Sequence, residues 1–65
     1  MITITIATDN EAFTEGGGGL EVKRILDEAA RRLINSGGIH GVAAIGPFML
    51  RDINGNIVGT LEAQE

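Results

Sequence analysis

Few residues of this 65-residue chain could do acid–base or metal chemistry, and they are scattered along it. His40 is the only histidine, and the chain has no cysteine, so neither a thiolate zinc site nor a disulfide is available. No carboxylate lies near His40 in sequence, and no nucleophilic triad order is visible. Because any catalytic partner would have to arrive through folding, we interpret His40 as a surface histidine.

The carboxylates fall into two groups. Asp9, Glu11 and Glu15 form an acidic cluster that suits either a negative patch for a basic partner or ordinary turn chemistry and solvation. The segment 52–56, Asp-Ile-Asn-Gly-Asn, begins like a calcium loop, with oxygen ligands at alternate positions. Its glycine is fourth rather than sixth, and Ala63 occupies the position of the required glutamate, so we predict a turn.

Four consecutive glycines, residues 16–19, precede a predicted helix in the way that phosphate-binding loops do. Glu15 and Glu21 flank these glycines, and no Gly-Lys-Ser/Thr follows. Because carboxylates repel phosphate, we predict a plain flexible link.

The last third of the chain predicts a β-hairpin over 47–63. If Asn54-Gly55 forms a two-residue turn, Phe48 and Leu50 share a face with Leu61 and Ile57. A type I turn that starts at Asp52 and places Gly55 in a bulge would shift the pairing by one residue. The sequence leaves both registers open.

The first half of the chain predicts a strand over 2–7 and an amphipathic helix over 20–35. Isoleucine alternates with threonine from Ile2 to Ile6, which is typical of a half-buried strand and not of a signal peptide. Residues 8–11 have capping-box spacing, so one helical turn there would bring Ala12 and Phe13 inward. The helix has apolar residues at i, i+3, i+4 and i+7 spacing, namely Val22, Ile25, Leu26, Ala29 and Leu33.

The remaining side of that helix is charged and is predicted to be solvated, with Glu21 among its residues. Asp27 with Arg31 and Glu28 with Arg32 are spaced for favourable pairs along the helix. Residues 37–46 are small and apolar without a clear period, so they form either a loop or an extra strand; we favour the loop.

These elements predict one small α+β domain over residues 1–65. Its order is β-α-β-β, with a three-stranded, mostly antiparallel sheet and one amphipathic helix packed on one face. The helical connection permits either an antiparallel sheet with the third strand in the centre or a parallel pairing of the first two strands, and we favour the former.

Composition excludes several classes of function. The net charge is −4, and four of the five basic residues lie on the predicted helix, so we expect no nucleic-acid binding. Only two aromatic residues are present, which leaves no platform for stacking bases. No apolar stretch reaches the roughly 20 residues of a membrane-spanning helix. We expect a cytoplasmic protein, in the host cell if the protein is viral, with no metal or other cofactor.

The chain resembles small uncharacterised proteins encoded by phages and prophages. The matching pieces are the Ile-Thr strand with Thr8, Asp9 and Asn10, the helix from Val22 to Leu33, and the segment from Leu50 to Gly59. The resemblance implies a viral or mobile-element origin and brings no activity with it. Small tautomerases share the strand-helix-strand plan but use an N-terminal proline as base, and residue 2 is isoleucine.

We therefore expect a small non-enzymatic interaction protein that binds or modulates a host or phage protein. Its first strand is an uncharged sheet edge, which favours pairing with a partner or with a second copy. The candidate interaction surface comprises Thr3, Thr5, Asp9, Glu11 and Arg51. Three alternatives stay open: an oligomeric enzyme or ligand-binding subunit with an inter-subunit pocket that uses His40, Asp9 or Asp52, a virion structural component, and a DNA mimic.

Overall fold

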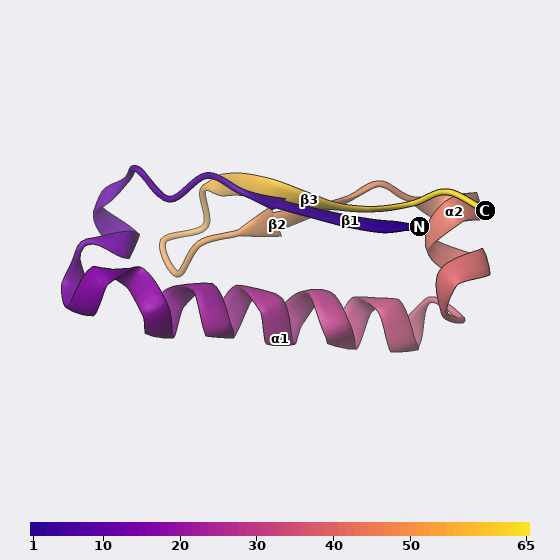
Figure 1. Cartoon of the computed structure of the whole chain (residues 1–65), viewed down its shortest axis with the longest axis horizontal. Helices are drawn as coiled ribbons and strands as arrows, with labels where there is room; N and C mark the ends of the chain where they lie inside the picture. Colours follow the sequence, from indigo (N-terminus) through magenta and orange to yellow (C-terminus); the bar gives the residue numbers. More distant parts are fainter.

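The computed structural model describes residues 1–65 and contains one sheet and two α-helices. The elements, in chain order, are β1 (Ile2–Ile6), the 3-10 turns η1 (Glu11–Phe13) and η2 (Glu15–Gly18), α1 (Gly19–Asn35), α2 (Ile39–Ile45), β2 (Phe48–Arg51) and β3 (Ile57–Ala63). The strand order is β1-β3-β2, and both pairings are antiparallel. Figure 1 shows α1 running along one face of the sheet. The predicted α+β class, with the third strand in the centre, is confirmed.

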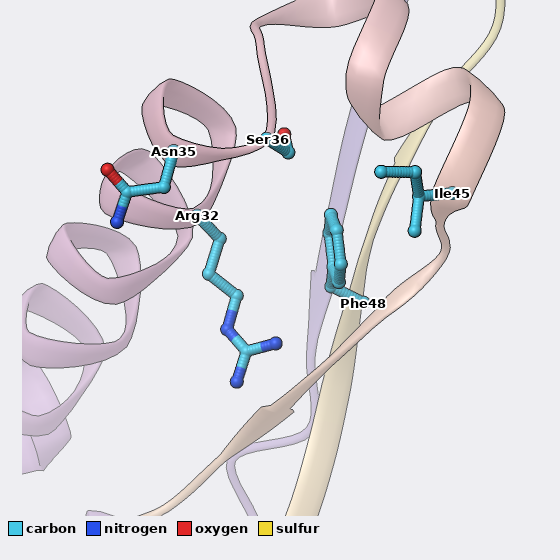
Figure 2. A pocket seen from close by; sticks show the side chains of 5 residues that line it. All are labelled: Arg32, Asn35, Ser36, Ile45 and Phe48. Atoms are coloured by element: carbon cyan, nitrogen blue, oxygen red, sulfur yellow. The ribbon is translucent and has the colours of Figure 1, made fainter.

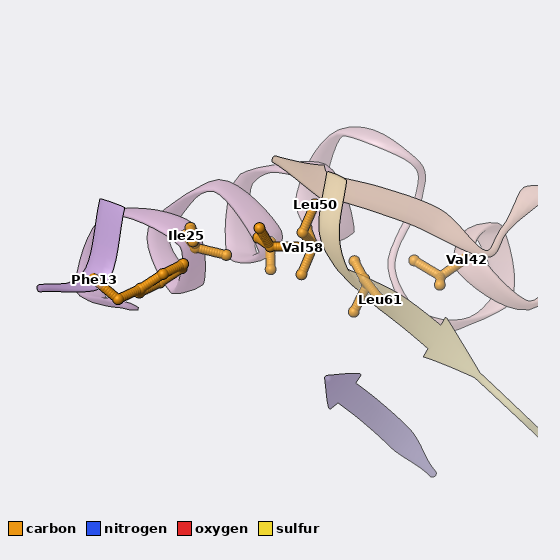
Figure 3. Packing of buried hydrophobic residues seen from close by; sticks show 7 residues of the cluster. Phe13, Ile25, Val42, Leu50, Val58 and Leu61 are labelled. Atoms are coloured by element: carbon orange, nitrogen blue, oxygen red, sulfur yellow. The ribbon is translucent and has the colours of Figure 1, made fainter. Parts of the chain in front are cut away.

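The core lies between α1 and the hairpin, as Figure 3 shows. Its buried apolar side chains are Phe13, Ile25, Ala29, Val42, Leu50, Val58 and Leu61. Ile25 and Ala29 belong to the predicted helical stripe, whereas Leu26 of that stripe is largely exposed. The reason is that α1 lies against β2 at one edge of the sheet and does not cover β1 at the other.

The turn is the second of the two that the sequence left open, whereas Phe48 and Leu50 keep the pairing of the first, opposite Leu61 and Gly59. The backbone N–H of Gly55 donates to the carbonyl of Asp52 at 3.0 Å, and Gly55 has a φ of 87°, a conformation that glycine adopts at least cost. The β2–β3 register then shifts between Leu50 and Arg51. This irregularity offsets the shift of the turn, so Phe48 and Leu50 share a face with Leu61, as the two-residue turn would have given. Ile57, which that alternative placed on the same face, is 54% exposed, and Val58 is buried in its stead.

Residues 37–46 were predicted to be a loop, and this was wrong, because residues 39–45 form α2. The helix is short, with Val42 as its only buried residue, which explains the lack of a clear apolar period. It packs closely on the end of α1: a side chain at Gly41 would collide with the backbone of Ser36. The small residues therefore permit a close helix–helix approach.

The link between β1 and α1 is ordered. Asn10 caps η1 by accepting from the Ala12 N–H at 2.8 Å, in place of the predicted cap at residue 8, and Phe13 is buried as expected. Gly16, Gly17 and Gly18 all have positive φ, and Gly18 is buried against Phe13. The predicted flexible link is therefore a specific left-handed turn that glycine alone adopts easily.

The exposed side of α1 is charged, and one of its two predicted pairs forms. Glu28 contacts Arg32 at 3.5 Å, as predicted, and also contacts Arg31. Asp27 pairs with Lys23 at 2.7 Å, in place of the predicted pair with Arg31. Neither helix is long and apolar enough to cross a membrane.

Candidate functional site

The most connected polar group of the molecule is the buried carboxylate of Asp52, at the start of the β2–β3 turn. One of its oxygens accepts from the backbone N–H groups of Asn54 and Asn56, each at 2.9 Å. The other accepts from the side-chain amides of Asn10 at 2.8 Å and Asn56 at 3.1 Å. Both oxygens are thus occupied, so this carboxylate acts as the organiser of the turn.

The same contacts decide the protonation of Asp52. Burial alone would raise the pKa of this carboxyl, but the hydrogen bonds from Asn56, Asn10 and Asn54 outweigh burial and hold its pKa below the ordinary 3.8. A carboxylate that stays ionised and fully bonded is a poor general base and has no free oxygen for a cation. The turn interpretation of residues 52–56 is confirmed.

Glu21 was placed on the solvated side of the helix by the sequence, and this was wrong, because its side chain is buried. It accepts from the guanidinium of Arg24 at 2.7 Å and from the backbone N–H of Ile53, also at 2.7 Å. The hydrogen bond from Arg24 lowers the pKa of Glu21, burial opposes this, and the bond from Ile53 adds to the lowering. Glu21 therefore fastens the β2–β3 turn to the first turn of α1.

Replacing Glu21 with glutamine tests this role. The Glu21→Gln side chain keeps the shape but loses the charge that strengthens both hydrogen bonds. We expect the Ile53 amide to exchange with solvent about tenfold faster, with little change at core amides. Amide hydrogen exchange by NMR measures this, and Glu28→Gln, on the exposed side of the same helix, is the control. Equal acceleration in both variants, or none in either, would contradict the proposed anchor.

Two surface hollows are present, and Figure 2 shows the first. It has a volume of about 330 Å³ and is lined by Arg32, Asn35, Ser36, Ile45 and Phe48. The Arg32 guanidinium lies 5.6 Å from the centre of the Phe48 ring, a cation–π distance. An anion here would meet the Glu28 carboxylate beside Arg32 and the negative end of the α1 dipole. The first hollow therefore does not favour an anionic ligand.

The second hollow, of about 450 Å³, lies at the opposite end of α1. Its lining residues are Ala12, Glu15, Gly16, Leu20, Glu21, Arg24 and Ile53. The only cation among them, Arg24, is bonded to Glu21 and to the carbonyl of Arg51. Arg24 and Glu21 are thus paired with each other, and Glu15 adds a negative charge to the hollow.

The five residues predicted as an interaction surface lie in separate places. Thr3 and Thr5 are exposed on β1, and Asp9 and Glu11 are exposed in and before η1. Arg51 lies on β2, at the other edge of the sheet, and donates to the carbonyl of Gly55 at 2.9 Å. The structure thus places these residues in three separate elements and does not gather them into one surface.

The three residues of the enzyme alternative are not gathered either. His40 is exposed on α2 and contacts Glu65, while Asp9 follows β1 at the opposite end of the molecule (Figure 1). Both carboxylate oxygens of Asp52 already accept hydrogen bonds within the β2–β3 turn and from Asn10. Neither hollow includes His40, and no three His, Cys, Asp or Glu side chains are grouped closely enough to hold a metal ion.

The two edges of the sheet differ in how they are protected. At the β2 edge, α1 lies alongside, and Arg24 donates to the carbonyl of Arg51 at 2.9 Å. That strand is also short, begins after Pro47 and carries a charge at Arg51. These are devices that block further strand pairing. The β1 edge has none of them: it has no charge, proline, bulge or covering helix.

The pairing of β1 with β3 decides which residues of β1 direct their N–H and C=O groups to the open edge; we call this alternation the hydrogen-bond phase of β1. Met1 and Gln64 exchange two backbone bonds, of 2.6 and 2.9 Å, and the Ala7 N–H donates to Val58 at 2.7 Å. Successive strand residues direct their N–H and C=O groups to opposite sides, so the odd-numbered residues face β3. The even-numbered residues of β1 therefore point their N–H and C=O groups outward. Sequence reasoning identified the edge but missed this phase, which depends on the pairing register.

Comparisons with protein-family models, curated proteins and solved structures found no match to this chain.

Proposed function

We propose that this chain is a small non-enzymatic interaction module that binds another protein by strand addition at the edge of β1. The observation that carries the proposal is the contrast between a protected β2 edge and an unprotected β1 edge in the same three-stranded sheet. A partner strand added there would gain main-chain hydrogen bonds, which are the source of affinity in this mode of recognition.

The side chains of β1 add an apolar surface to the open backbone. Ile2 and Ile6 pack partly against the core, whereas Ile4, between them, is 39% exposed. All three lie on the face of the sheet that carries Leu61, because Ile4 is paired directly with it. A partner would therefore meet an isoleucine row on one face and Thr3 and Thr5 on the other.

The biological setting that we propose is a phage or prophage accessory protein that modulates a host or phage protein. The support is the resemblance of the Ile-Thr strand, the central helix and the C-terminal hairpin to small phage-encoded proteins. The acidic residues Asp9 and Glu11, exposed just beyond the end of β1, favour a partner with basic residues next to its docking strand.

Affinity capture with matched variants tests this proposal. Ile4→Lys puts a charge on the docking edge, and Leu20→Lys makes a similar change at an 85% exposed site of α1 away from β1. We expect a host or phage protein to be retained by the natural chain and by Leu20→Lys, with at least about a tenfold loss for Ile4→Lys.

The retained protein is then purified and added back, and the exchange of the Ile4 amide is measured by NMR. The proposal predicts slower exchange of this outward-facing amide in the complex. Equal retention by both lysine variants, or a complex in which the Ile4 amide exchanges as in the free chain, would refute docking at β1.

A further inference from the structure

We propose that the strand added at β1 is β1 of a second copy, paired antiparallel about a two-fold axis at Ile4. The resulting sheet has six strands in the order β2-β3-β1-β1-β3-β2. This inference rests on the proposed function, because the second copy takes the same docking edge, and a host or phage protein would bind there only by displacing it. The experiments below separate the two.

The sequence of β1 is self-complementary in this arrangement. Residues 2–6 read Ile-Thr-Ile-Thr-Ile in both directions. In an antiparallel pair centred on Ile4, Ile2 of one copy lies opposite Ile6 of the other, and Thr3 lies opposite Thr5. Isoleucine thus meets isoleucine and threonine meets threonine at every position, so like side chains pack against each other on both faces of the pair. The two-fold axis repeats each of these contacts.

The hydrogen-bond phase of β1 selects the same register. Ile2, Ile4 and Ile6 are the residues whose N–H and C=O groups point to the open edge, because the odd-numbered residues are bonded to β3. Centring the pair on Ile4 brings these outward-facing residues opposite one another, so that each opposed pair exchanges both backbone bonds. A slip of one residue would place residues that are already bonded to β3 opposite residues that face the open edge. A slip of two would leave two isoleucine pairs in place of three.

The two-fold axis of an antiparallel pair is perpendicular to the sheet, so both α1 helices lie on the same face. The isoleucine rows of the two copies also share that face, and each Ile4 covers its counterpart.

Assembly ends at two copies. The outer edges of the six-stranded sheet are the two β2 strands, each protected by the bond from Arg24 to the Arg51 carbonyl and by α1. The contact uses the same strand of both copies and leaves no further β1 edge free, so it closes on itself.

Cysteine cross-linking tests the register directly, because the natural chain has no cysteine. Thr3→Cys and Thr5→Cys change exposed residues, and in the proposed dimer these positions face each other across a pair without direct backbone bonds. There the Cα atoms are about 4.5 Å apart, within the range of a disulfide. We expect a mixture of the two variants under mild oxidation to give the mixed disulfide at least about tenfold faster than either variant alone gives its own.

Equal rates in the three reactions would show collisional cross-linking and overturn the proposal. Fastest cross-linking of Thr3→Cys alone, or of Thr5→Cys alone, would indicate a slipped register and overturn the pairing about Ile4.

Sedimentation equilibrium provides the second measurement. We expect the natural chain and Leu20→Lys to have twice the 6.8 kDa chain mass, and Ile4→Lys to sediment as a monomer with an unchanged circular dichroism spectrum. If Ile4→Lys fails to fold, the Ile4 amide is N-methylated in a synthetic chain, which removes the outward N–H. We then expect the dissociation constant of the dimer to rise about tenfold. A natural chain that stays monomeric at about 100 µM has a dissociation constant weaker than that value, and this refutes the dimer. Protection of the Ile4 amide by a different purified protein would then still support docking at β1, whereas its absence would refute both.

Discussion

Replacing Ile25 with alanine is expected to lower the free energy of unfolding by about 2–5 kcal/mol. Ile25 is fully buried on α1 and packs in the cluster with Leu50, Val58 and Leu61. Truncating a buried isoleucine to alanine typically costs about 2–5 kcal/mol. A domain of this size has a total stability of roughly 3–10 kcal/mol, so one such change removes a large part of it. Urea denaturation followed by circular dichroism measures the loss.

The matched control is Ile34→Ala, the same change on the same helix at a position that is 76% exposed. Little apolar area is lost there, and alanine is the better helix former, so we expect a change within about 0.5 kcal/mol. If the two variants denatured at the same urea concentration, this would contradict the burial of Ile25 between α1 and the hairpin.

Replacing Asp52 with asparagine is expected to lower the melting temperature by roughly 10 °C, although the two side chains have the same shape. The asparagine oxygen can still accept from the N–H groups of the turn, but its NH₂ would face the donating amides of Asn10 and Asn56. Asn10 cannot turn its amide around without giving up the Ala12 N–H that its oxygen caps. The variant therefore buries the new NH₂ group against the NH₂ groups of Asn10 and Asn56, and these donors lose their acceptor.

The same variant should have a flatter acid limb in a plot of stability against pH. The pKa of Asp52 is lower in the folded chain than its ordinary 3.8, so its contribution is fully present above that value and is lost as the pH falls through the folded pKa. Glu21 acts in the same direction from its ordinary 4.5. The natural chain should thus lose stability below about pH 4.5, and Asp52→Asn should lose less over that range.

Thermal denaturation at a series of pH values measures both effects. Asp9→Asn is the control. Asp9 is exposed, precedes Asn10 in the chain, and its carboxylate has no hydrogen-bond partner, whereas Asn10 donates to Asp52. A melting temperature for Asp52→Asn equal to that of Asp9→Asn, with parallel acid limbs, would show that the carboxylate does not organise the turn.

The elements whose side chains repeat with a clear period could be predicted from the amino-acid sequence. Alternating β-branched residues gave β1, the i, i+3, i+4, i+7 stripe gave α1, and the turn residues around Asn54-Gly55 gave the hairpin. In each of these the local backbone preference and the apolar pattern agree, and so the α+β class followed. The strand order stayed open between an antiparallel and a partly parallel sheet until the structure showed β1-β3-β2. The uncharged character of the β1 edge was also visible in the sequence, because it depends only on composition.

Only the tertiary structure decided the features that depend on which segments meet. Glu21 is buried because the β2–β3 turn lies over the first turn of α1, and no helical pattern contains that contact. Residues 39–45 became a helix because Gly41 lets α2 approach the end of α1, and a seven-residue segment has too little period to reveal its state. The outward phase of the even-numbered residues of β1 follows from the register with β3, and register is a property of two strands together.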